Sequence, residues 1–474
     1  MATINHQIGD TICAIATPAG SGGIAIIRVS GSNAIAMCDK IFRPAHRSKS
    51  LATQPANTTL FGYIYDCEEV VDEVVATLFR TPHSFTGEDT VEIACHGSHY
   101  IQQRIVTLLL SVGCRMADPG EFTRRAFASG RIDLSQAEAV ADLIAATSAS
   151  AHRLAINQMR GQFSRRLSEL RLQLLDFVSL IELELDFSEE DVQFADRAKL
   201  LTLIQEISSE ISRLASSFSV GNAIKNGIPV AIVGETNAGK STLLNRLVHD
   251  DRALVSDIHG TTRDVIEDTI TLGGILFRFI DTAGIRETND TIESMGIERT
   301  FGKLQQSEIA IWLIDSTTPT LEVEELAQRI LPLCQDKQLI IVFNKADLID
   351  STKKTILEKL QTSLLEQRPH TPTLCISAKN DQGIEQLEQQ LIEAAGLPAA
   401  DNNDIIVTNA RHHQALTHAL DAITRVADGL SNNIPADFVA QDIRECMHLL
   451  GEITGQITTD DILGSIFSRF CIGK

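Results

Sequence analysis

Several features that would place this chain in a membrane or outside the cell are missing from its 474 residues. No apolar run approaches the roughly 20 residues that a membrane helix needs, so no transmembrane span is expected. The first residues do not combine a charged region with a long apolar stretch, which argues against a secretory signal. The nine cysteines are scattered and form no C-x-x-C pair, which is typical of reduced thiols rather than of a disulfide framework. We therefore expect a cytoplasmic protein without a membrane anchor.

Positive charge is also scarce. The chain carries 41 Lys and Arg residues against 62 Asp and Glu residues, a formal net charge of -21. This acidic balance favours solubility and argues mildly against a general nucleic-acid binder, which usually has a basic domain. A local basic patch is compatible with it, although a solvated helix face explains the same residues equally well. The candidates are Arg153, Arg160, Arg165, Arg166 and Arg171, expected along one helix, with Arg124, Arg125 and Arg131 near them.

The pattern of apolar and polar residues changes along the chain. The chain is also too long for one hydrophobic core, because single domains rarely exceed ~300 residues. Residues 1–125 mix short β-like runs with turns and predict a small α+β domain. Residues 126–222 repeat apolar side chains at helical spacing and predict a bundle, and residues 396–474 are helical again. Between them, residues 223–395 alternate strands with helices, which predicts a parallel sheet covered on both faces. The expected fold is therefore an α+β domain followed by a helical domain into which an α/β domain is inserted.

A phosphate-binding loop opens the predicted α/β domain. Residues 234–241 match G-x-x-x-x-G-K-[ST] and lie between a predicted strand and a predicted helix, the context that this motif requires. The glycines let backbone N–H groups approach phosphate oxygens at a helix N-terminus. Lys240 reaches the outer phosphates, and the Ser241 hydroxyl binds magnesium.

Two further motifs follow predicted strands in the order that a guanine-nucleotide site requires. Asp281-Thr282-Ala283-Gly284 supplies a carboxylate for the magnesium ion and a glycine that senses the γ-phosphate. Asn344-Lys345-Ala346-Asp347 ends on a carboxylate that accepts both N1–H and the 2-amino group of guanine, whereas adenine offers no such pair of donors. The backbone of Ser377-Ala378-Lys379, after the next strand, is expected at the guanine oxygen. Together the motifs predict a GTP site.

One catalytic element of simple GTPases is missing. Residues 260–264, Gly-Thr-Thr-Arg-Asp, lie between the first two motifs, and Thr262 is the expected magnesium and γ-phosphate ligand of a switch segment. Simple GTPases place a glutamine directly after D-x-x-G to orient the attacking water. Ile285 occupies that position here and cannot orient water. Hydrolysis must therefore use a polar group from elsewhere.

The motifs resemble those of a known family. Residues 237–241, 260–264 and 281–284 are similar to the TrmE–Era group of GTPases. Four further segments, Phe85-Thr86-Gly87-Glu88-Asp89, Pro119-Gly120-Glu121-Phe122, Asp133-Leu134-Ser135-Gln136-Ala137-Glu138-Ala139 and Phe470-Cys471-Ile472-Gly473-Lys474, resemble the tRNA-modification GTPases of the MnmE (TrmE) family. The similarity spans essentially the whole chain.

The resemblance implies a folate-binding and dimerisation domain, a helical domain and an inserted Ras-like G domain. It implies a homodimer that joins an FAD-dependent partner, MnmG (GidA), in a heterotetramer. Together these proteins would modify carbon 5 of the wobble uridine of tRNA, adding an aminomethyl or carboxymethylaminomethyl group. The one-carbon unit would come from a 5-formyl or methylene tetrahydrofolate. The GTPase would be activated by potassium.

The resemblance also assigns roles to individual residues of the G domain. Potassium would be bound by Asn237 with oxygens of Ser256, Ile258 and Thr261. Glu293 would organise the attacking water through a bridging water; without the resemblance, a solvated helix carboxylate is its plainest interpretation. Contacts to GTP would come from residues 237–242 (Asn237, Ala238, Gly239, Lys240, Ser241 and Thr242) and 256–262 (Ser256, Asp257, Ile258, His259, Gly260, Thr261 and Thr262), together with Asp281, Thr282, Ala283, Gly284, Asn344, Lys345, Asp347, Ser377, Ala378 and Lys379.

In the N-terminal domain the resemblance places folate at Arg28, Glu92 and Arg131, with Lys474 reaching the same site. Carboxylates of the folate tail suit arginines, and the pterin ring offers donors to Glu92. Arg131 replaces a lysine expected there, and Glu235-Thr236 replace an expected Arg-Pro in the phosphate loop. Cys471 is a candidate nucleophile toward carbon 6 of uridine, or simply a buried or flexible cysteine. Residues 471–474 do not fit a prenylation box.

Two other functions are considered. An Era-like regulatory GTPase that binds ribosomal RNA should contain a KH module with a G-x-x-G loop, and none is visible after residue 400. A folate-dependent one-carbon transferase with GTP only as a regulator would share the same N-terminal domain.

Overall fold

The computed structural model describes residues 10–46, 50–186, 197–235, 237–249, 268–280, 304–349, 351–396, 405–432, 434–468, 470 and 473. The chain divides into two compact units. The first comprises Met1–Ala145, Ala155–Ile211 and Ala415–Lys474, and the second comprises Ala146–Leu154 and Ser212–Gln414. Among the helices of the described ranges, none combines the length and the apolar character needed to cross a membrane.

The first unit begins with a seven-stranded sheet of order β3-β4-β5-β6-β2-β1-β7. All neighbouring strands are antiparallel except β1 and β7. Alternate residues of β4 and β5 are buried, so one face of the sheet carries a core. The strands are β1 (Ile12–Ile15), β2 (Gly22–Ser30), β3 (Phe42–Pro44), β4 (Thr58–Asp66), β5 (Glu69–Phe79), β6 (Thr90–Gly97) and β7 (Arg115–Met116).

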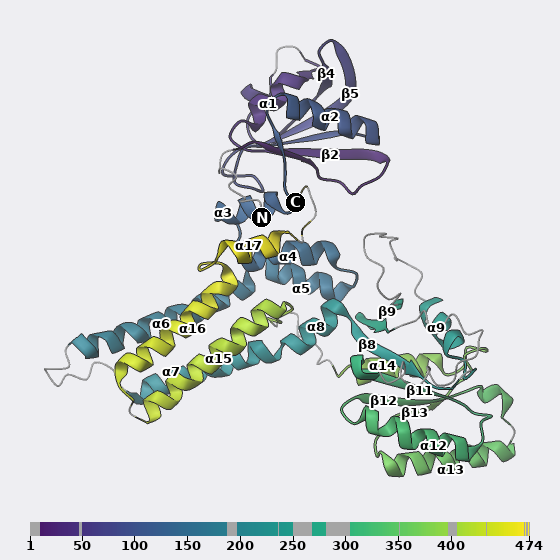
Figure 1. Cartoon of the computed structure of the whole chain (residues 1–474). Helices are drawn as coiled ribbons and strands as arrows, with labels where there is room; N and C mark the ends of the chain where they lie inside the picture. Colours follow the sequence, from purple (N-terminus) through teal and green to yellow (C-terminus); the bar gives the residue numbers. More distant parts are fainter. Residues whose placement is uncertain are drawn as a thin grey trace. The chain divides into compact units, whose positions relative to one another are not determined.

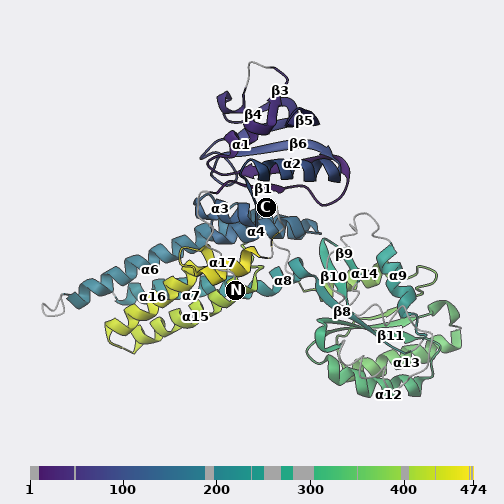
Figure 2. The same cartoon turned by 45° about the horizontal axis from the view of Figure 1, so that its top comes forward.

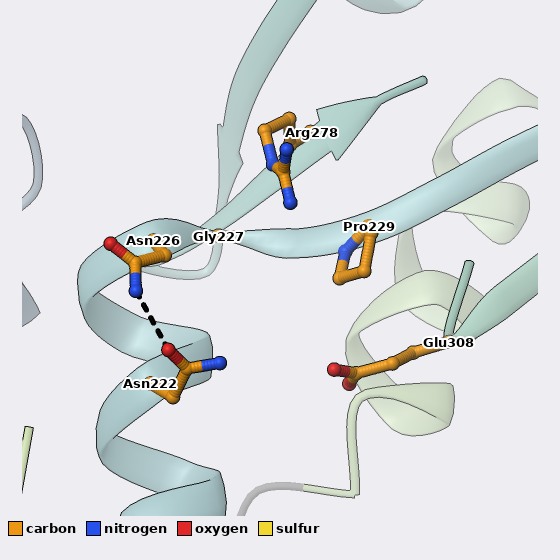
Figure 3. A pocket seen from close by; sticks show the side chains of 6 residues that line it. All are labelled: Asn222, Asn226, Gly227, Pro229, Arg278 and Glu308. Carbon is orange, nitrogen blue, oxygen red and sulfur yellow. Dashed lines mark hydrogen bonds between the residues drawn. The ribbon is translucent and has the colours of Figure 1, made fainter. Parts of the chain in front are cut away.

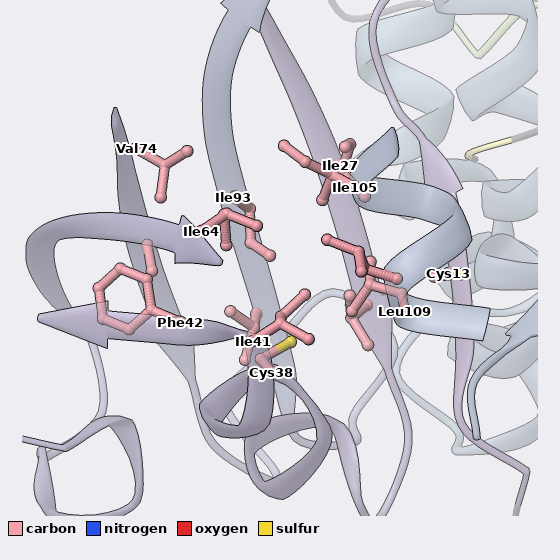
Figure 4. Packing of buried hydrophobic residues seen from close by; sticks show 14 of the residues in the cluster. Cys13, Ile27, Cys38, Ile41, Phe42, Ile64, Val74, Ile93, Ile105 and Leu109 are labelled. Carbon is pink, nitrogen blue, oxygen red and sulfur yellow. The ribbon is translucent and has the colours of Figure 1, made fainter. Parts of the chain in front are cut away.

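Two helices cover that face, α1 (Ala34–Ile41) and α2 (His99–Ser111), and a short 3-10 helix, η1 (Leu51–Thr53), adds Leu51 to the core. Figure 4 shows Cys38 of α1 and Leu109 of α2 packed against the strand residues Ile27, Ile64 and Ile93. The predicted α+β character of this region is confirmed.

Helices follow in both parts of the chain that flank the α/β segment. They are α3 (Glu121–Ala128), α4 (Leu134–Ala145), α5 (Ala149–Met159), α6 (Gln162–Asp186), α7 (Arg197–Ser216), α8 (Phe218–Asn226), α15 (Ala410–Ser431), α16 (Ala436–Thr454) and α17 (Asp460–Phe467). In the first unit α6 packs along α16, far away in sequence (Figures 1 and 2). Arg171 of α6 donates to the Met447 carbonyl of α16 at 3.0 Å. Helices from both sides of the α/β segment therefore pack together, as expected for an insertion.

The second unit contains a six-stranded sheet of order β13-β12-β11-β8-β10-β9, parallel except for β9. Its strands are β8 (Ile228–Val233), β9 (Asp268–Leu272), β10 (Ile275–Phe279), β11 (Ile309–Asp315), β12 (Gln338–Asn344) and β13 (Thr373–Cys375). Helices α9 (Lys240–His249) and α14 (Ile384–Ala394) pack on one face, and α12 (Thr320–Ile330) and α13 (Ser351–Gln367) on the other. The 3-10 helices η3 (Leu331–Cys334) and η4 (Ala346–Leu348) complete it. The Ras-like α/β prediction is confirmed, with β9 antiparallel to β10 at one edge of the sheet.

Candidate functional site

Three of the predicted nucleotide motifs, those of the described residues, meet at one edge of the second sheet. The phosphate loop follows β8, Asn344 ends β12, and Ser377 lies just after β13. These strands are parallel, so their carboxyl ends share one edge, where ligands of such sheets usually bind.

The phosphate loop wraps around the ammonium group of Lys240. Its Nζ donates to the carbonyl oxygens of Gly234 at 2.8 Å and Glu235 at 2.7 Å. Gly239 has φ +96°, and a Cβ there would lie 2.3 Å from Nδ2 of Asn344, so the loop requires a glycine at this close approach. Ala238 is buried, Ser241 is half-buried, and Asn237 and Thr242 are exposed. The loop thus places N–H groups and one cation at the start of α9, an arrangement suited to phosphate.

Asn344 joins two of the motifs directly. Its Nδ2 donates to the Ala238 carbonyl of the phosphate loop at 2.8 Å, and its Oδ1 accepts from the Ala378 N–H at 3.0 Å. The side chain is nearly fully buried. A single amide therefore fixes the spacing between the phosphate loop and the Ser377–Lys379 loop.

The other residues of the N-K-x-D motif are fixed by neighbouring loops. The Ser377 hydroxyl donates to Oδ1 of the exposed Asp347 at 2.6 Å, which orients the carboxylate. Lys345 adopts φ +61° and its Nζ lies 2.6 Å from Oδ2 of Asp315, at the end of β11. Burial alone would raise the pKa of Asp315, but hydrogen bonds from Lys345 and Thr317 outweigh it and hold the pKa below its usual value. Sequence analysis missed Asp315, although its position at a strand end was a usable signal.

Several predicted residues cannot be placed in this geometry, because they lie outside the described residues. They are Ser256, Asp257, Ile258, His259, Gly260, Thr261, Thr262, Asp281, Thr282, Ala283, Gly284 and Glu293 of the second unit, and Cys471 and Lys474 of the first. Lys379 is described and is exposed.

A second group of predicted residues gathers in the first unit, where Arg28 of β2 faces Glu92 of β6. Arg28 donates from Nε to Oε1 of Glu92 at 2.9 Å, and its Nη2 lies 2.8 Å from the same oxygen. The guanidinium lies 5.6 Å from the ring centres of both Phe85 and Phe122, within cation–π range. Its Nη1 donates to the Gly473 carbonyl at 3.4 Å. The structure thus brings Arg28 and Glu92 together, together with two rings that sequence analysis did not assign.

Arg131, the third predicted member of this group, lies just after α3. It is exposed, and its backbone N–H donates to the Ala126 carbonyl at 3.0 Å. Within the described residues no hydrogen bond or ion pair joins it to Arg28 or Glu92.

A buried carboxylate lies beside this group at the start of α3. Glu121 is 1% exposed and receives both terminal nitrogens of Arg115, at 2.7 and 3.0 Å, and Nη2 of Arg125 at 3.0 Å. Burial alone would raise its pKa, but these hydrogen bonds and one from the Asp118 N–H outweigh burial and lower the pKa to about 2. Arg125 also contacts Glu88, at 3.0 Å. The Phe85–Asp89 and Pro119–Phe122 segments are therefore joined by ion pairs.

The predicted arginine patch differs from its expectation. One helix was expected to carry it, but the structure has two, α5 and α6, with Gly161 between them, so the single-helix prediction is wrong. Arg166 pairs with Glu210 and Glu169, at 2.9 Å each, and Arg171 bonds to a backbone carbonyl. Carboxylates thus offset part of the positive charge expected there.

A shallow hollow of about 420 Å³ lies at the other end of the second sheet. Figure 3 shows Asn222 of α8 and Glu308 on opposite sides of it and Arg278 above, with Asn226 of α8 beside Asn222. Pro229 at the start of β8 also lines it, so it is remote from the nucleotide edge where β8 ends. None of the predicted site residues lines this hollow.

The fold and this edge define a class. A parallel sheet with a phosphate loop after one strand and N-K-x-D after another is a guanine-nucleotide-binding G domain. Flanking it are a sheet domain and helices that simple G domains do not need.

Comparisons with known proteins identify the family. The model described as "GTP-binding protein TrmE N-terminus" matches residues 11–131, and "MnmE helical domain" matches residues 134–471. The chain is 60% identical over 465 residues to the tRNA modification GTPase MnmE of Bacteroides thetaiotaomicron, covering 98% of this chain and 99% of that protein. It is 50% identical over 477 residues to that of Christiangramia forsetii, covering 99% and 100%. The chain belongs to the MnmE family of tRNA-modification GTPases.

Solved structures also match in part. Era from Aquifex aeolicus is 26% identical, over 41% of this chain and 66% of that chain, with a TM-score of 0.27. A score this low adds nothing to the family assignment.

Proposed function

We propose that this chain is a potassium-activated GTPase that acts with an FAD-dependent partner of the MnmG (GidA) type on tRNA. The complex adds an aminomethyl or carboxymethylaminomethyl group to carbon 5 of the wobble uridine, using a one-carbon unit from a 5-formyl or methylene tetrahydrofolate. The observation that carries the proposal is Asn344, which ties the phosphate loop to the Ser377 loop in a chain of this family.

In the G domain, oxygen atoms of the protein bind each of the two metal ions and the guanine base. Ser241 and Thr262 bind Mg²⁺ beside the phosphates, and Asp347 reads guanine. Asn237, with Ser256, Ile258 and Thr261, binds K⁺, which supplies the positive charge that an arginine finger supplies elsewhere. The exposed position of Asn237 in the phosphate loop supports this role, since a hard cation prefers oxygen ligands. Glu293 orients the attacking water that Ile285 cannot.

In the N-terminal domain the proposal assigns the tetrahydrofolate derivative to Arg28 and Glu92, with Arg131 and Lys474. The pairing of Arg28 with Glu92 between two aromatic rings supports it, since a pterin ring is flat and offers donors to a carboxylate. Cys471 is the proposed nucleophile. Its thiolate adds to carbon 6 of uridine, which makes carbon 5 nucleophilic toward the one-carbon unit.

The proposed partners follow from the same family. The chain forms a homodimer, and two copies join two copies of the flavoprotein in a heterotetramer. Much of the tRNA binding falls to that partner, because this chain carries a net charge of -21.

The decisive experiment deletes the gene and measures the wobble uridine of total tRNA by nucleoside mass spectrometry. We expect the modified nucleoside to disappear and to return when the intact gene is supplied. Complementation with Glu293→Ala should fail while that variant still binds GTP. Unchanged modification in the deletion strain would refute the proposed function.

Potassium dependence is tested separately by comparing GTP hydrolysis in potassium and in sodium at equal ionic strength. Wild type should be faster in potassium, and Asn237→Ala should lose the difference. Equal wild-type rates in both salts would remove the cation from the mechanism.

A further inference from the structure

The turn before α3 is packed against the last described residues of the chain. Gly120 has φ +67°, and a Cβ there would lie 2.8 Å from the Phe467 carbonyl oxygen and 2.9 Å from the Cβ of Phe470. The two phenylalanines belong to one small core with Leu134 and Ala137. Gly120 therefore permits an approach that any larger residue would block. We call Phe467, Phe470 and Gly473 the tail residues.

Gly473 makes a second close approach, to the end of β1. It is buried, with φ +98°, and a Cβ there would lie 2.3 Å from the Ile15 carbonyl oxygen. Its own carbonyl accepts the 3.4 Å hydrogen bond from Nη1 of Arg28. The tail residues thus contact the N-terminal domain at Gly120 and at the end of β1. The Gly473 carbonyl also accepts a hydrogen bond from the guanidinium of Arg28 in the proposed folate site.

The segment that begins at Gly120 is also held by ion pairs. Glu121 directly follows Gly120 and is held by Arg115 and Arg125. Phe122 comes next, is fully buried, and presents its ring to Arg28. The short segment 120–122 therefore contacts the tail residues through Gly120 and contacts Arg28 through Phe122.

We propose that Gly120 and Gly473 are positioning residues. Because neither carries a Cβ, the tail residues pack closely against the N-terminal domain, and this packing keeps the Gly473 carbonyl in contact with Arg28. That contact fixes the direction of the Arg28 guanidinium beside Glu92. The choice of ligand in its test rests on the proposed function, in which Arg28 binds a tetrahydrofolate derivative. The packing itself does not depend on that function.

The test compares Gly120→Ala and Gly473→Ala in the full-length protein with matched controls. Gly130 (φ +71°) and Gly20 (φ +129°) also have positive φ, but a Cβ at either would meet nothing within 4 Å. Gly130→Ala and Gly20→Ala therefore introduce comparable backbone strain without the clash. Gly120→Asn is a further test variant, because asparagine tolerates positive φ but still carries the clashing Cβ.

Two readouts separate packing from ligand binding. Hydrogen exchange by mass spectrometry should show faster exchange in peptides covering 22–30 and 464–473 for Gly120→Ala, Gly120→Asn and Gly473→Ala, but not for Gly130→Ala or Gly20→Ala. Calorimetric affinity for 5-formyltetrahydrofolate should fall about fivefold, as expected when one oriented hydrogen bond is lost. GTP hydrolysis should stay within twofold of wild type in all variants.

If Gly120→Ala and Gly473→Ala exchange and bind like Gly130→Ala and Gly20→Ala, or if Gly120→Asn restores wild-type behaviour, the positioning role is refuted. If exchange rises but affinity does not change, the tail residues do not position Arg28, and the proposal is equally refuted. If wild type itself fails to bind 5-formyltetrahydrofolate, the one-carbon part of the proposed function fails, and the exchange data alone then decide whether the two glycines seat the tail.

Discussion

The two candidate sites are built in opposite ways. The nucleotide site of the second unit uses short contiguous motifs, each at the end of a parallel strand. The Arg28 site of the first unit draws on positions 28, 85, 92, 122 and 473, which are brought together by adjacent sheet strands, the loop between β5 and β6, one helix and the tail residues. The comparison shows that a site built from contiguous motifs leaves a local sequence pattern, whereas a site built from side chains far apart in the sequence does not.

The physical reason is the kind of group that does the binding. Phosphates are bound by backbone N–H groups of a loop, which demands glycines at fixed spacing and one lysine. A guanidinium between two rings demands only a charge and two aromatics, which many sequences supply. The first requirement is visible in a single sequence, and the second becomes visible only through a resemblance or a structure.

The largest expected effect tests whether the contiguous motifs act as one unit. Asn344→Ala leaves the Ala238 carbonyl and the Ala378 N–H without their partner, and two such losses cost about 4 kcal/mol in the stability of the G domain. We expect GTP binding, measured with a fluorescent analogue, to be lost and the melting temperature to fall.

The matched control is Asn380→Ala, because Asn380 is exposed in the same loop. It should change stability by no more than about 0.5 kcal/mol. Normal GTP binding by Asn344→Ala would show that the two loops are positioned independently.

The second prediction concerns Glu121, which holds the start of α3 beside the Arg28 site. It is measured as the dependence of stability on pH. The pKa of Glu121 falls from 4.5 to about 2, a difference worth about 3 kcal/mol. A lowered pKa means that this stability is fully present above pH 4.5 and is lost as the pH falls toward 2. Glu121→Gln should therefore destabilise the first unit at neutral pH, with a deficit that shrinks in acid.

Denaturant unfolding of wild type and Glu121→Gln between pH 2 and 7 checks this. The exposed carboxylate Glu69 offers the control, since Glu69→Gln should track wild type at every pH. A deficit that stays constant from neutral pH to pH 2 would mean that Glu121 acts through its shape and not through its charge.

The same contrast explains what the sequence could and could not predict. The strands before the phosphate loop, before Asn344 and before Ser377 were predicted, because buried parallel strands are short continuous apolar runs. β9, Asp-Thr-Ile-Thr-Leu, alternates polar and apolar residues at the edge of the sheet, which is the pattern of a half-buried strand, so the sequence did contain a signal for it. The break at Gly161 was underestimated, because apolar spacing alone continues across it.

Side-chain partners were harder still. The pairing of Arg28 with Glu92 depends on the register between β2 and β6, which no local pattern specifies. The sequence identified Gly120 and Gly473 only as members of motifs. The structural need for each glycine comes from a close approach to residues more than 340 positions away, which the sequence does not reveal.

The third prediction tests the guanine-reading residue. Asp347→Asn removes the acceptor for two donors of guanine, so GTP affinity should fall about 100-fold. Xanthine carries a carbonyl where guanine has its 2-amino group, so xanthosine triphosphate should bind better to the variant than to wild type. Competition assays with the two nucleotides measure both effects.

Asp381→Asn is the control for that experiment. Asp381 is an exposed carboxylate just beyond the Ser377–Lys379 loop, 3.7 Å from Arg246, and its change should alter GTP affinity less than twofold. Unchanged base preference in Asp347→Asn would show that guanine is read elsewhere.

The smallest effect concerns Arg28, and it tests whether shape or charge alone defines the scattered site. Arg28→Lys keeps the charge but loses the fork that places two nitrogens on Glu92 and the flat group between Phe85 and Phe122. Affinity for 5-formyltetrahydrofolate should fall about tenfold, with GTP hydrolysis unchanged. Arg43→Lys removes another arginine that lies over a ring, 4.1 Å from that of Tyr65, and should leave the affinity unchanged. If Arg28→Lys binds as tightly as wild type, a point charge is enough, and the aromatic rings and the Gly473 carbonyl are not part of the recognition.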